Sequence, residues 1–198
     1  MSIVIGLTGP TGSGKSTASK TAANLGFKVI DCDKVARVAV EKGTEGLAAL
    51  TDVFGNGILN ADGTLNRKEL AKKAFMTKEN TELLNKTLLP YIVALVKKEM
   101  DSPYVLLDAP TLFESGINSM CDVTVAVLAD RDVRLSRICA RDGIDEESAI
   151  LRINAGKTDD FYLNNVDFAI YNNTNESNFI CEFEKVICEI KENFSKGE

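Results

Sequence analysis

Short apolar runs alternate along the chain with longer segments in which apolar residues recur at helical spacing. Five of these runs are short, hydrophobic and bounded by polar residues or turn residues. They predict buried strands at 3–8, 27–30, 104–108, 123–128 and 166–171. Strands that alternate with helices are typical of a parallel sheet with helices packed against it. The pattern therefore predicts an α/β fold with a five-stranded parallel sheet.

Helices are expected between these runs, most clearly at 15–25, 34–40, 78–88 and 177–194 and after the caps Asn66 and Asp145. The stretch 41–101 contains helical patterns and turns but no strand-like run. Within it, the helix at 78–88 is expected to stop at Leu89, because Pro90 lacks the N–H that a continuing helix needs. Pro90 then suits the first turn of a following helix. We expect this stretch to be a helical insertion.

The first predicted strand leads into a glycine-rich segment, Gly9–Thr17, which reads G-P-T-G-S-G-K-S-T. It matches G-x-x-x-x-G-K-[ST] at every fixed position. Glycines let several backbone N–H groups converge on one anion, and the next helix adds its positive N-terminal end. The pattern predicts a nucleotide phosphate site at Gly12, Ser13, Gly14, Lys15, Ser16 and Thr17. The alternative is an ordinary glycine-rich turn.

Within this loop, Lys15 is expected to neutralise β- and γ-phosphate oxygens, and the Ser16 hydroxyl is expected to hold Mg²⁺. Asp108 ends the third predicted strand. An acid at this position in phosphate-loop proteins commonly supports the same metal ion, directly or through water. These residues therefore predict a nucleotide with bound Mg²⁺.

Two more carboxylates, Asp31 and Asp33, follow the second predicted strand. Open α/β sheets bind ligands at the carboxyl ends of their strands. In a kinase, an Asp here would accept a hydrogen bond from the attacking hydroxyl, and Asp33 is the candidate for that role. The alternative is that either residue only caps the helix expected at 34–40.

A cluster of arginines follows the fourth predicted strand, with Arg134, Arg137 and Arg141 close to one stripe of a helix. In an acidic protein with a phosphate loop, such a cluster favours stabilisation of transferring phosphate charge. A solvated helix face paired with neighbouring aspartates is the alternative. Gly143 separates this helix from the one capped by Asp145, and the pair is expected to form a lid that excludes water.

Composition narrows the function further. The 198 residues carry a net charge of −6 with a pI near 4.9, which argues against nucleic acid or anionic lipid as a partner. Histidine is absent, so histidine-based nucleophilic catalysis is excluded. The five cysteines lack metal-site spacing, and no apolar run suits a membrane span, so a cytoplasmic location is expected. The sequence makes no prediction of oligomeric state.

The chain resembles the dephospho-CoA kinase family over nearly its whole length. Beyond the phosphate loop, the resemblance rests on Ile30-Asp31-Cys32-Asp33 with Ala36-Arg37, Phe54-Gly55, Asp62-Gly63-Thr64-Leu65-Asn66-Arg67 with Leu70-Ala71, Asp108-Ala109-Pro110 with Leu112-Phe113-Glu114, and Arg137 with Arg141. The segments Asp-Gly-x-Leu-Asn-Arg and Pro-x-Leu-Phe-Glu are its most specific parts, since many families share the phosphate loop.

This resemblance implies a three-layer phosphate-loop kinase fold in a single kinase domain. Its core would cover 1–40, 103–136 and 160–198, with a helical CoA-binding insertion at 41–102 and a lid at 137–159. The implied reaction transfers the ATP γ-phosphate to the ribose 3′-hydroxyl of dephospho-CoA, with Mg²⁺. This is the last step of coenzyme A synthesis.

The resemblance also implies roles for individual residues. Catalysis would depend on Asp33, Lys15 and Arg141, and Arg137 would contact the nucleotide from the lid region. The acceptor site would be shaped by Asp33, Arg67, Phe113 and Glu114.

The chain departs from the family pattern at several positions. Leu89 replaces the usual His before Pro90, and Pro10-Thr11 replaces the usual Gly-Ile. Thr111 and Asn154 also differ from the customary residues, a leucine and a lid glutamine. Two other functions stay open: a different small-molecule kinase of this fold, acting for instance on shikimate, gluconate or a nucleoside, or a nucleotide-dependent switch without an acceptor. The length of the insertion and Leu65-Asn66-Arg67 count against the first.

Overall fold

The structure is a computed structural model that describes residues 3–196, and the chain divides into two compact units. The first, which we call the phosphate-loop unit, comprises Met1–Val29, Ser102–Pro110 and Cys121–Glu198. The second, the helical unit, comprises Ile30–Asp101 and Thr111–Met120. Residues 1–2 and 197–198, which the sequence analysis assigned to the core, lie outside the described residues.

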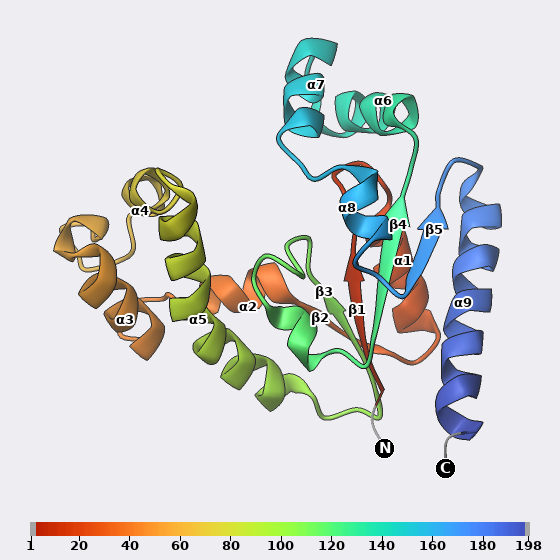
Figure 1. Cartoon of the computed structure of the whole chain (residues 1–198), viewed down its shortest axis with the longest axis horizontal. Helices are drawn as coiled ribbons and strands as arrows, with labels where there is room; N and C mark the ends of the chain where they lie inside the picture. The colour runs from red at the N-terminus through yellow and green to blue at the C-terminus, as the bar shows by residue number, and fades with distance from the viewer. Residues whose placement is uncertain (1–2, 197–198) are drawn as a thin grey trace. The chain divides into compact units, whose positions relative to one another are not determined.

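Five strands form one sheet in the order β2-β3-β1-β4-β5 (Figure 1). They are β1 (Ile3–Thr8), β2 (Lys28–Asp31), β3 (Tyr104–Asp108), β4 (Val123–Leu128) and β5 (Phe168–Tyr171). β1 pairs in parallel with β3 and β4, and β4 pairs in parallel with β5. The predicted α/β class is confirmed, although β2 and β5 begin one and two residues later than expected.

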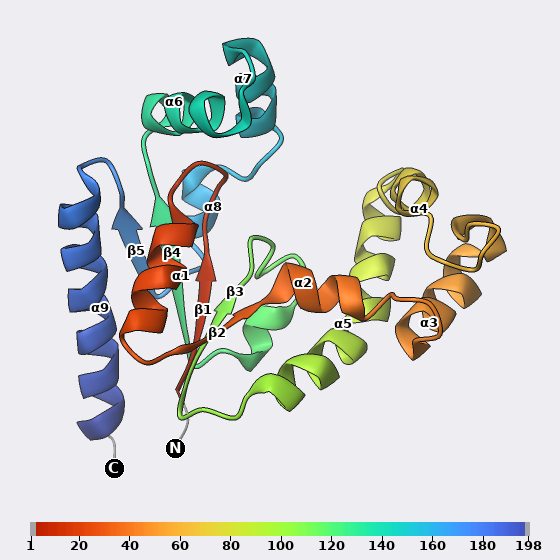
Figure 2. The same cartoon turned by 180° about the vertical axis from the view of Figure 1, so that it is seen from behind.

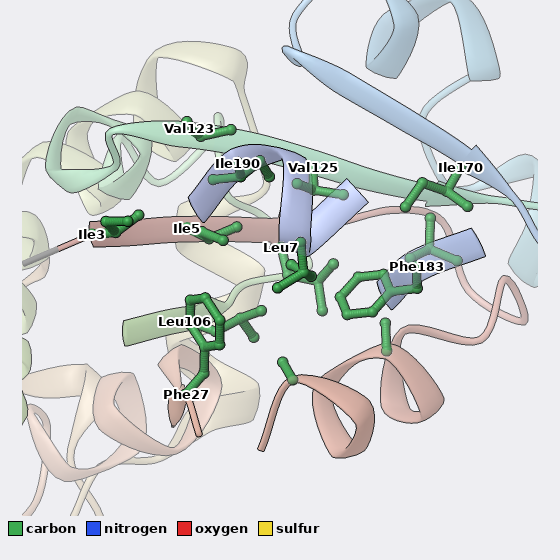
Figure 3. Packing of buried hydrophobic residues seen from close by; sticks show 14 of the residues in the cluster. Ile3, Ile5, Leu7, Phe27, Leu106, Val123, Val125, Ile170, Phe183 and Ile190 are labelled. Atoms are coloured by element: carbon green, nitrogen blue, oxygen red, sulfur yellow. The ribbon is translucent and has the colours of Figure 1, made fainter. Parts of the chain in front are cut away.

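Two helices of the phosphate-loop unit, α1 (Lys15–Asn24) and α9 (Glu176–Lys196), pack on one face of the sheet. Alternate residues of β1 and β4 meet the apolar side of α9, and Figure 3 shows Leu7, Val125 and Phe183 in this core. Fully burying a large apolar side chain such as Phe183 contributes roughly 1.5–3 kcal/mol. The opposite face packs against Tyr162 of α8 (Asp159–Leu163), a short helix that the sequence analysis did not predict.

The helices α6 (Arg131–Asp142) and α7 (Glu146–Asn154) form the predicted helix pair after β4 (Figure 1). α6 ends at Gly143, whose φ of 63° is the left-handed conformation that glycine adopts readily. Asp145 caps α7 as predicted, since its Oδ1 accepts a hydrogen bond of 2.7 Å from the Ser148 N–H. Ile138, Ala149 and Ile153 form a small core of their own between the two helices.

The helical unit consists of α2 (Cys32–Val38), α3 (Glu45–Phe54), η1 (Asn56–Ile58), α4 (Arg67–Ala74), α5 (Lys78–Glu99) and η2 (Ile117–Met120). Its buried core joins α3, η1 and α4 through Leu50, Ile58 and Leu70. The predicted cap Asn66 is confirmed, because its Oδ1 accepts a hydrogen bond of 3.1 Å from the Glu69 N–H. The starting points of α2, α3, α4 and α5 follow local capping signals, since the side chain of each N-cap residue accepts a hydrogen bond from a backbone N–H of its helix.

The predicted break at Leu89 is wrong, because α5 continues through Pro90 to Glu99. Proline removes one helical hydrogen bond and displaces the preceding turn, and the axis of α5 bends partway along its length (Figures 1 and 2). Burial of Ile92 and Val96 stabilises the part of α5 beyond the proline. Long as α5 and α9 are, none of the helices described within residues 3–196 combines the length and the apolar character needed to span a membrane.

Candidate active site

The phosphate loop connects β1 to α1 in a backbone path that requires glycine. Gly9 has a φ of 139°, and a Cβ at this position would overlap the carbonyl oxygen of Val127 on β4. Gly14, with a φ of 103°, is the N-cap of α1 and has no side chain to bond the first helical N–H groups. The described first turn of α1 also contains no acidic residue. These amides therefore present positive potential suited to an anion.

The ammonium group of Lys15 folds back over this loop. Its Nζ donates a hydrogen bond of 2.6 Å to the Gly9 carbonyl and lies 3.5 Å from the Pro10 carbonyl. The charge is thus positioned beside the backbone amides rather than out in solvent, as expected for the lysine of a phosphate loop. The remaining predicted loop residues, Gly12, Ser13, Ser16 and Thr17, lie on the same loop and the first turn of α1.

The loop is also held from outside through its carbonyl groups. Nδ2 of Asn172, directly after β5, donates a hydrogen bond of 2.9 Å to the Ser13 carbonyl. Arg137 Nη1 donates a second bond of 3.4 Å to the same oxygen, and its Nη2 donates to Asn172 Oδ1 at 3.2 Å. Arg134 Nε donates to the Thr11 carbonyl at 3.1 Å. Hydrogen bonds from three side chains therefore fix the loop's shape.

Asp108 lies at the same edge of the sheet, because β3 is in register with β1 and pairs Asp108 with Leu7. Its Oδ2 accepts a hydrogen bond of 2.7 Å from Ser19 Oγ on α1, which fixes the carboxylate next to the helix that carries Ser16. Among the described residues there is no group of three His, Cys, Asp or Glu side chains that could hold a metal ion. A serine hydroxyl and one carboxylate nevertheless fit Mg²⁺, which is bound by few protein ligands together with substrate phosphates.

The three arginines expected on one stripe of α6 have different surroundings. Arg134 is only 5% exposed and pairs with Asp159 of α8 at 3.5 Å, and burial lowers the pKa of its guanidinium despite that carboxylate. Arg137 is half-buried against the loop. Arg141 is exposed and forms two hydrogen bonds with Asp142, of 2.7 and 2.9 Å.

Asp142 also contacts Arg152 of α7, so one carboxylate links two arginines of the helix pair. The hydrogen bonds from Arg141 lower the pKa of Asp142, and the same bonds raise the pKa of Arg141. Arg131 Nη2 donates a hydrogen bond of 3.2 Å to Asn154 Oδ1, the residue found where the family pattern suggests a lid glutamine. The α6–α7 pair therefore has polar ties in addition to its apolar core.

In the helical unit, Asp31 makes the capping contact that the alternative predicts for it. Asp31 is the N-cap of α2, and its Oδ1 accepts a hydrogen bond of 3.0 Å from the Lys34 N–H. Asp33 lies in the first turn of α2 with its side chain exposed. Arg67 is likewise exposed in the first turn of α4. Both charged side chains are carried at the beginnings of helices.

The other predicted acceptor residues, Phe113 and Glu114, are half-buried in the segment between β3 and η2. Asn85 of α5 holds this segment, since its Nδ2 donates a hydrogen bond of 2.7 Å to the Glu114 carbonyl. Leu89 lies on the same helix, and its Cδ2 is 3.1 Å from where a Cβ on Gly116 would be. Leu89, which replaces the family's usual His, therefore makes an apolar contact with this segment.

Sequence reasoning missed Asn172 and Asn85 as contributors to the site. Each amide acts on a backbone carbonyl far away in the sequence, 159 residues away for Asn172 and 29 for Asn85. Neither belongs to a short motif with a known mechanism. The only available signal was that Asn172 directly follows a predicted strand, at the edge where ligands bind.

A parallel sheet, a glycine-rich phosphate loop with its lysine, and an acid at the end of the neighbouring strand together define a phosphate-loop kinase. The family model for dephospho-CoA kinase matches residues 3–178, and the chain belongs to that family. It is accordingly a phosphotransferase enzyme.

Individual relatives agree with this assignment. The dephospho-CoA kinase of Corynebacterium efficiens is 38% identical over 192 residues, covering 94% of this chain and 96% of the relative. Among solved structures, the dephospho-CoA kinase from Campylobacter jejuni has a TM-score of 0.66 at 27% identity, covering 98% of this chain and 99% of that one. TT1252 from Thermus thermophilus has a TM-score of 0.77 at 28% identity, covering 95% and 97%.

Proposed function

We propose that this chain transfers the γ-phosphate of ATP to the ribose 3′-hydroxyl of dephospho-CoA and so makes coenzyme A. The 3′-hydroxyl oxygen forms the new bond to the γ-phosphorus, and the bond from that phosphorus to the β,γ-bridging oxygen breaks. ADP leaves with the bonding electron pair, and the hydroxyl proton passes to Asp33 late in the transfer. The observation that carries the proposal is the braced phosphate loop with Lys15, in a chain that belongs to this kinase family. None of the five cysteines, all of which lie within the described residues, forms a disulfide, which supports a reducing cytoplasm as its location.

On the nucleotide side, the backbone from Gly12 to Thr17 and the Lys15 ammonium would bind the phosphates. Ser13 Oγ is fully buried, and within the described part of the chain it has no hydrogen-bond partner, so a phosphate oxygen would suit it. Ser16 and Asp108 would hold Mg²⁺, which offsets phosphate charge when bound. Arg137 and Arg141 would add positive charge from α6, and Arg141 would exchange Asp142 for phosphate.

On the acceptor side, Asp33 would accept a hydrogen bond from the 3′-hydroxyl and align its oxygen for attack. With a loose transition state, alignment matters more than early removal of the proton, so a carboxylate of ordinary basicity suffices. Arg67, Phe113 and Glu114 would shape the site for dephospho-CoA. The helical unit would thus bind the acceptor, with the insertion at about 41–102 as its main part. A lid at about 137–159, which belongs to the phosphate-loop unit, would exclude water.

The test is ADP release by the purified protein with Mg-ATP, comparing dephospho-CoA with adenosine, shikimate and no acceptor. We expect strong stimulation by dephospho-CoA alone, with the product identified as coenzyme A by mass. Stimulation by shikimate or adenosine instead would assign the chain to a different acceptor. Nucleotide binding without acceptor-dependent ADP release would favour the switch function.

A further inference from the structure

Asn172 joins the phosphate loop to the end of β5 through its side-chain amide. Its side chain is 5% exposed, and its backbone N–H donates a hydrogen bond of 2.8 Å to the Leu128 carbonyl, which fixes it at the end of β5. Both the nitrogen and the oxygen of the side-chain amide form hydrogen bonds. Nδ2 donates to the Ser13 carbonyl at 2.9 Å, and Oδ1 accepts from Arg137 at 3.2 Å.

The amide also lies directly against Gly14. A Cβ on Gly14 would overlap Nδ2 of Asn172, so the backbone of the loop and the amide are in close contact. The described residues contain no cis peptide, so the Ser13–Gly14 peptide is trans. In a trans peptide the C=O and the N–H point in opposite directions. A donor that holds the Ser13 carbonyl from outside therefore directs the Gly14 N–H toward the other side of the loop.

We propose that Asn172 is a positioning residue for nucleotide binding, which acts by fixing the Ser13–Gly14 peptide so that the Gly14 N–H faces the phosphates. It also holds the guanidinium of Arg137 beside the same peptide. This inference rests on the proposed nucleotide site but not on the identity of the acceptor. An oxyanion gains most from donors whose orientation is fixed before binding, because no reorganisation is then needed.

The test is the dissociation constant for Mg-ADP, measured by calorimetry without acceptor. Asn172→Asp keeps the size and an oxygen for Arg137 but replaces the donor to the Ser13 carbonyl with a carboxylate oxygen. Losing a buried hydrogen bond of this kind is expected to weaken Mg-ADP binding by roughly ten- to hundredfold. Asn172→Ala, which adds no charge, is the second variant and should weaken binding in the same direction.

Asn165→Asp is the matched control, because that exposed amide also donates to a backbone carbonyl, that of Phe161 at 2.7 Å. Its affinity for Mg-ADP should stay within about twofold of wild type, as for surface changes in general. In turnover assays the Asn172 variants should raise the KM for ATP and leave the KM for the acceptor unchanged. A purely structural role would lower the melting temperature without this split.

Folded Asn172 variants that bind Mg-ADP within twofold of wild type would overturn the proposal, and so would failure of both variants to fold. A wild-type protein that does not bind Mg-ADP would instead overturn the nucleotide part of the proposed function. Binding with the expected loss in the variants, but without phosphate transfer to dephospho-CoA, would support the role of Asn172 and refute only the proposed acceptor.

Discussion

In the phosphate-loop unit, the residues assigned to nucleotide binding are fixed by hydrogen bonds between distant parts of the chain. Ser13 is tied to Asn172 across 159 residues, Thr11 to Arg134 across 123, and Asp108 to Ser19 across 89. In the helical unit, two of the charged residues assigned to the acceptor, Asp33 and Arg67, lie in the first turns of helices. Those helices are set by caps only three residues apart, such as Asp31 with Lys34 and Asn66 with Glu69.

The difference shows how each unit's site depends on its own fold. Phosphate binding requires several donors in one fixed arrangement, which only the complete sheet can hold. A charged side chain in the first turn of a capped helix, such as Asp33 or Arg67, needs little more than that helix to hold it in place. We therefore expect changes in the phosphate-loop unit to alter nucleotide affinity, and changes in the helical unit to alter transfer or acceptor affinity while leaving the nucleotide bound.

The largest separation of the two effects is expected for Asp33→Asn. Without the carboxylate that aligns the hydroxyl, kcat should fall by about 10²- to 10⁴-fold, the range for groups that act on the transferred proton. Mg-ADP affinity, measured by calorimetry, should be nearly unchanged. Asp31→Ala is the control: losing that cap should cost about 1 kcal/mol of stability but leave transfer intact. If the Asp33→Asn enzyme remained active, a residue other than Asp33 would have to align the acceptor hydroxyl.

Lys15→Ala, unlike Asp33→Asn, should reduce the affinity for the nucleotide. Removing a charged donor to the phosphates is expected to weaken Mg-ADP binding by about ten- to hundredfold and to slow turnover as well. Lys20→Ala is a suitable control, since Lys20 is an exposed lysine on the same helix. If the Lys15 variant retained wild-type affinity and ATP-dependent kinetics, the assigned phosphate site would be wrong.

A smaller effect is expected for Asn85→Ala, which frees the Glu114 carbonyl and the segment with Phe113. Loss of one hydrogen bond should raise the KM for dephospho-CoA by roughly three- to tenfold, with nucleotide affinity unaffected. Asn80→Ala is matched to it, because Asn80 lies on the same helix and donates to the Lys73 carbonyl at 2.9 Å. Equal effects of the two variants on the acceptor KM would show that Asn85 acts only through the stability of α5.

The smallest effect is expected on stability, for Asp142, whose ion pairs with Arg141 and Arg152 lie inside the phosphate-loop unit. Its pKa is lowered by Arg141, so the ion pairs contribute stability above the ordinary Asp pKa of about 3.9 and lose it as pH falls through the lowered value. Urea unfolding should therefore show wild type more stable than Asp142→Asn at neutral pH, with the difference disappearing in acid. A difference that grows in acid would contradict this sign.

Much of the fold could be predicted because its signals are local. The strand periodicity, the phosphate-loop motif and the cap at Asn66 each lie within a few residues of one another. The helix through Pro90 could not be predicted, since the burial of Ile92 and Val96 offsets the local cost of proline. The helical spacing of the arginines also predicted that Arg134 and Arg141 share one face of a helix. It could not show that Arg134 is buried against Thr11 while Arg141 is exposed.

The candidate site was predictable where one motif carries the chemistry and hidden where tertiary structure supplies it. Lys15 and Ser16 follow directly from the phosphate-loop pattern. Asn172 and Asn85 do not, because an asparagine's partner depends on the strand or helix that the fold brings next to it. The roles of Arg67, Phe113 and Glu114 came from resemblance and stay predictions.

The long-range fixing of the loop has a consequence for synthesis on the ribosome. The phosphate loop is translated before the whole helical unit, whereas Asn172 and the α9 residues that cover the sheet, such as Phe179 and Phe183, are translated after it. Chains form from their N-terminal end, so a nascent chain displays the complete motif long before it has the partners that shape it. Nucleotide binding would therefore report that translation has passed β5, and ribosome-bound chains stalled before residue 172 should not retain Mg-ADP.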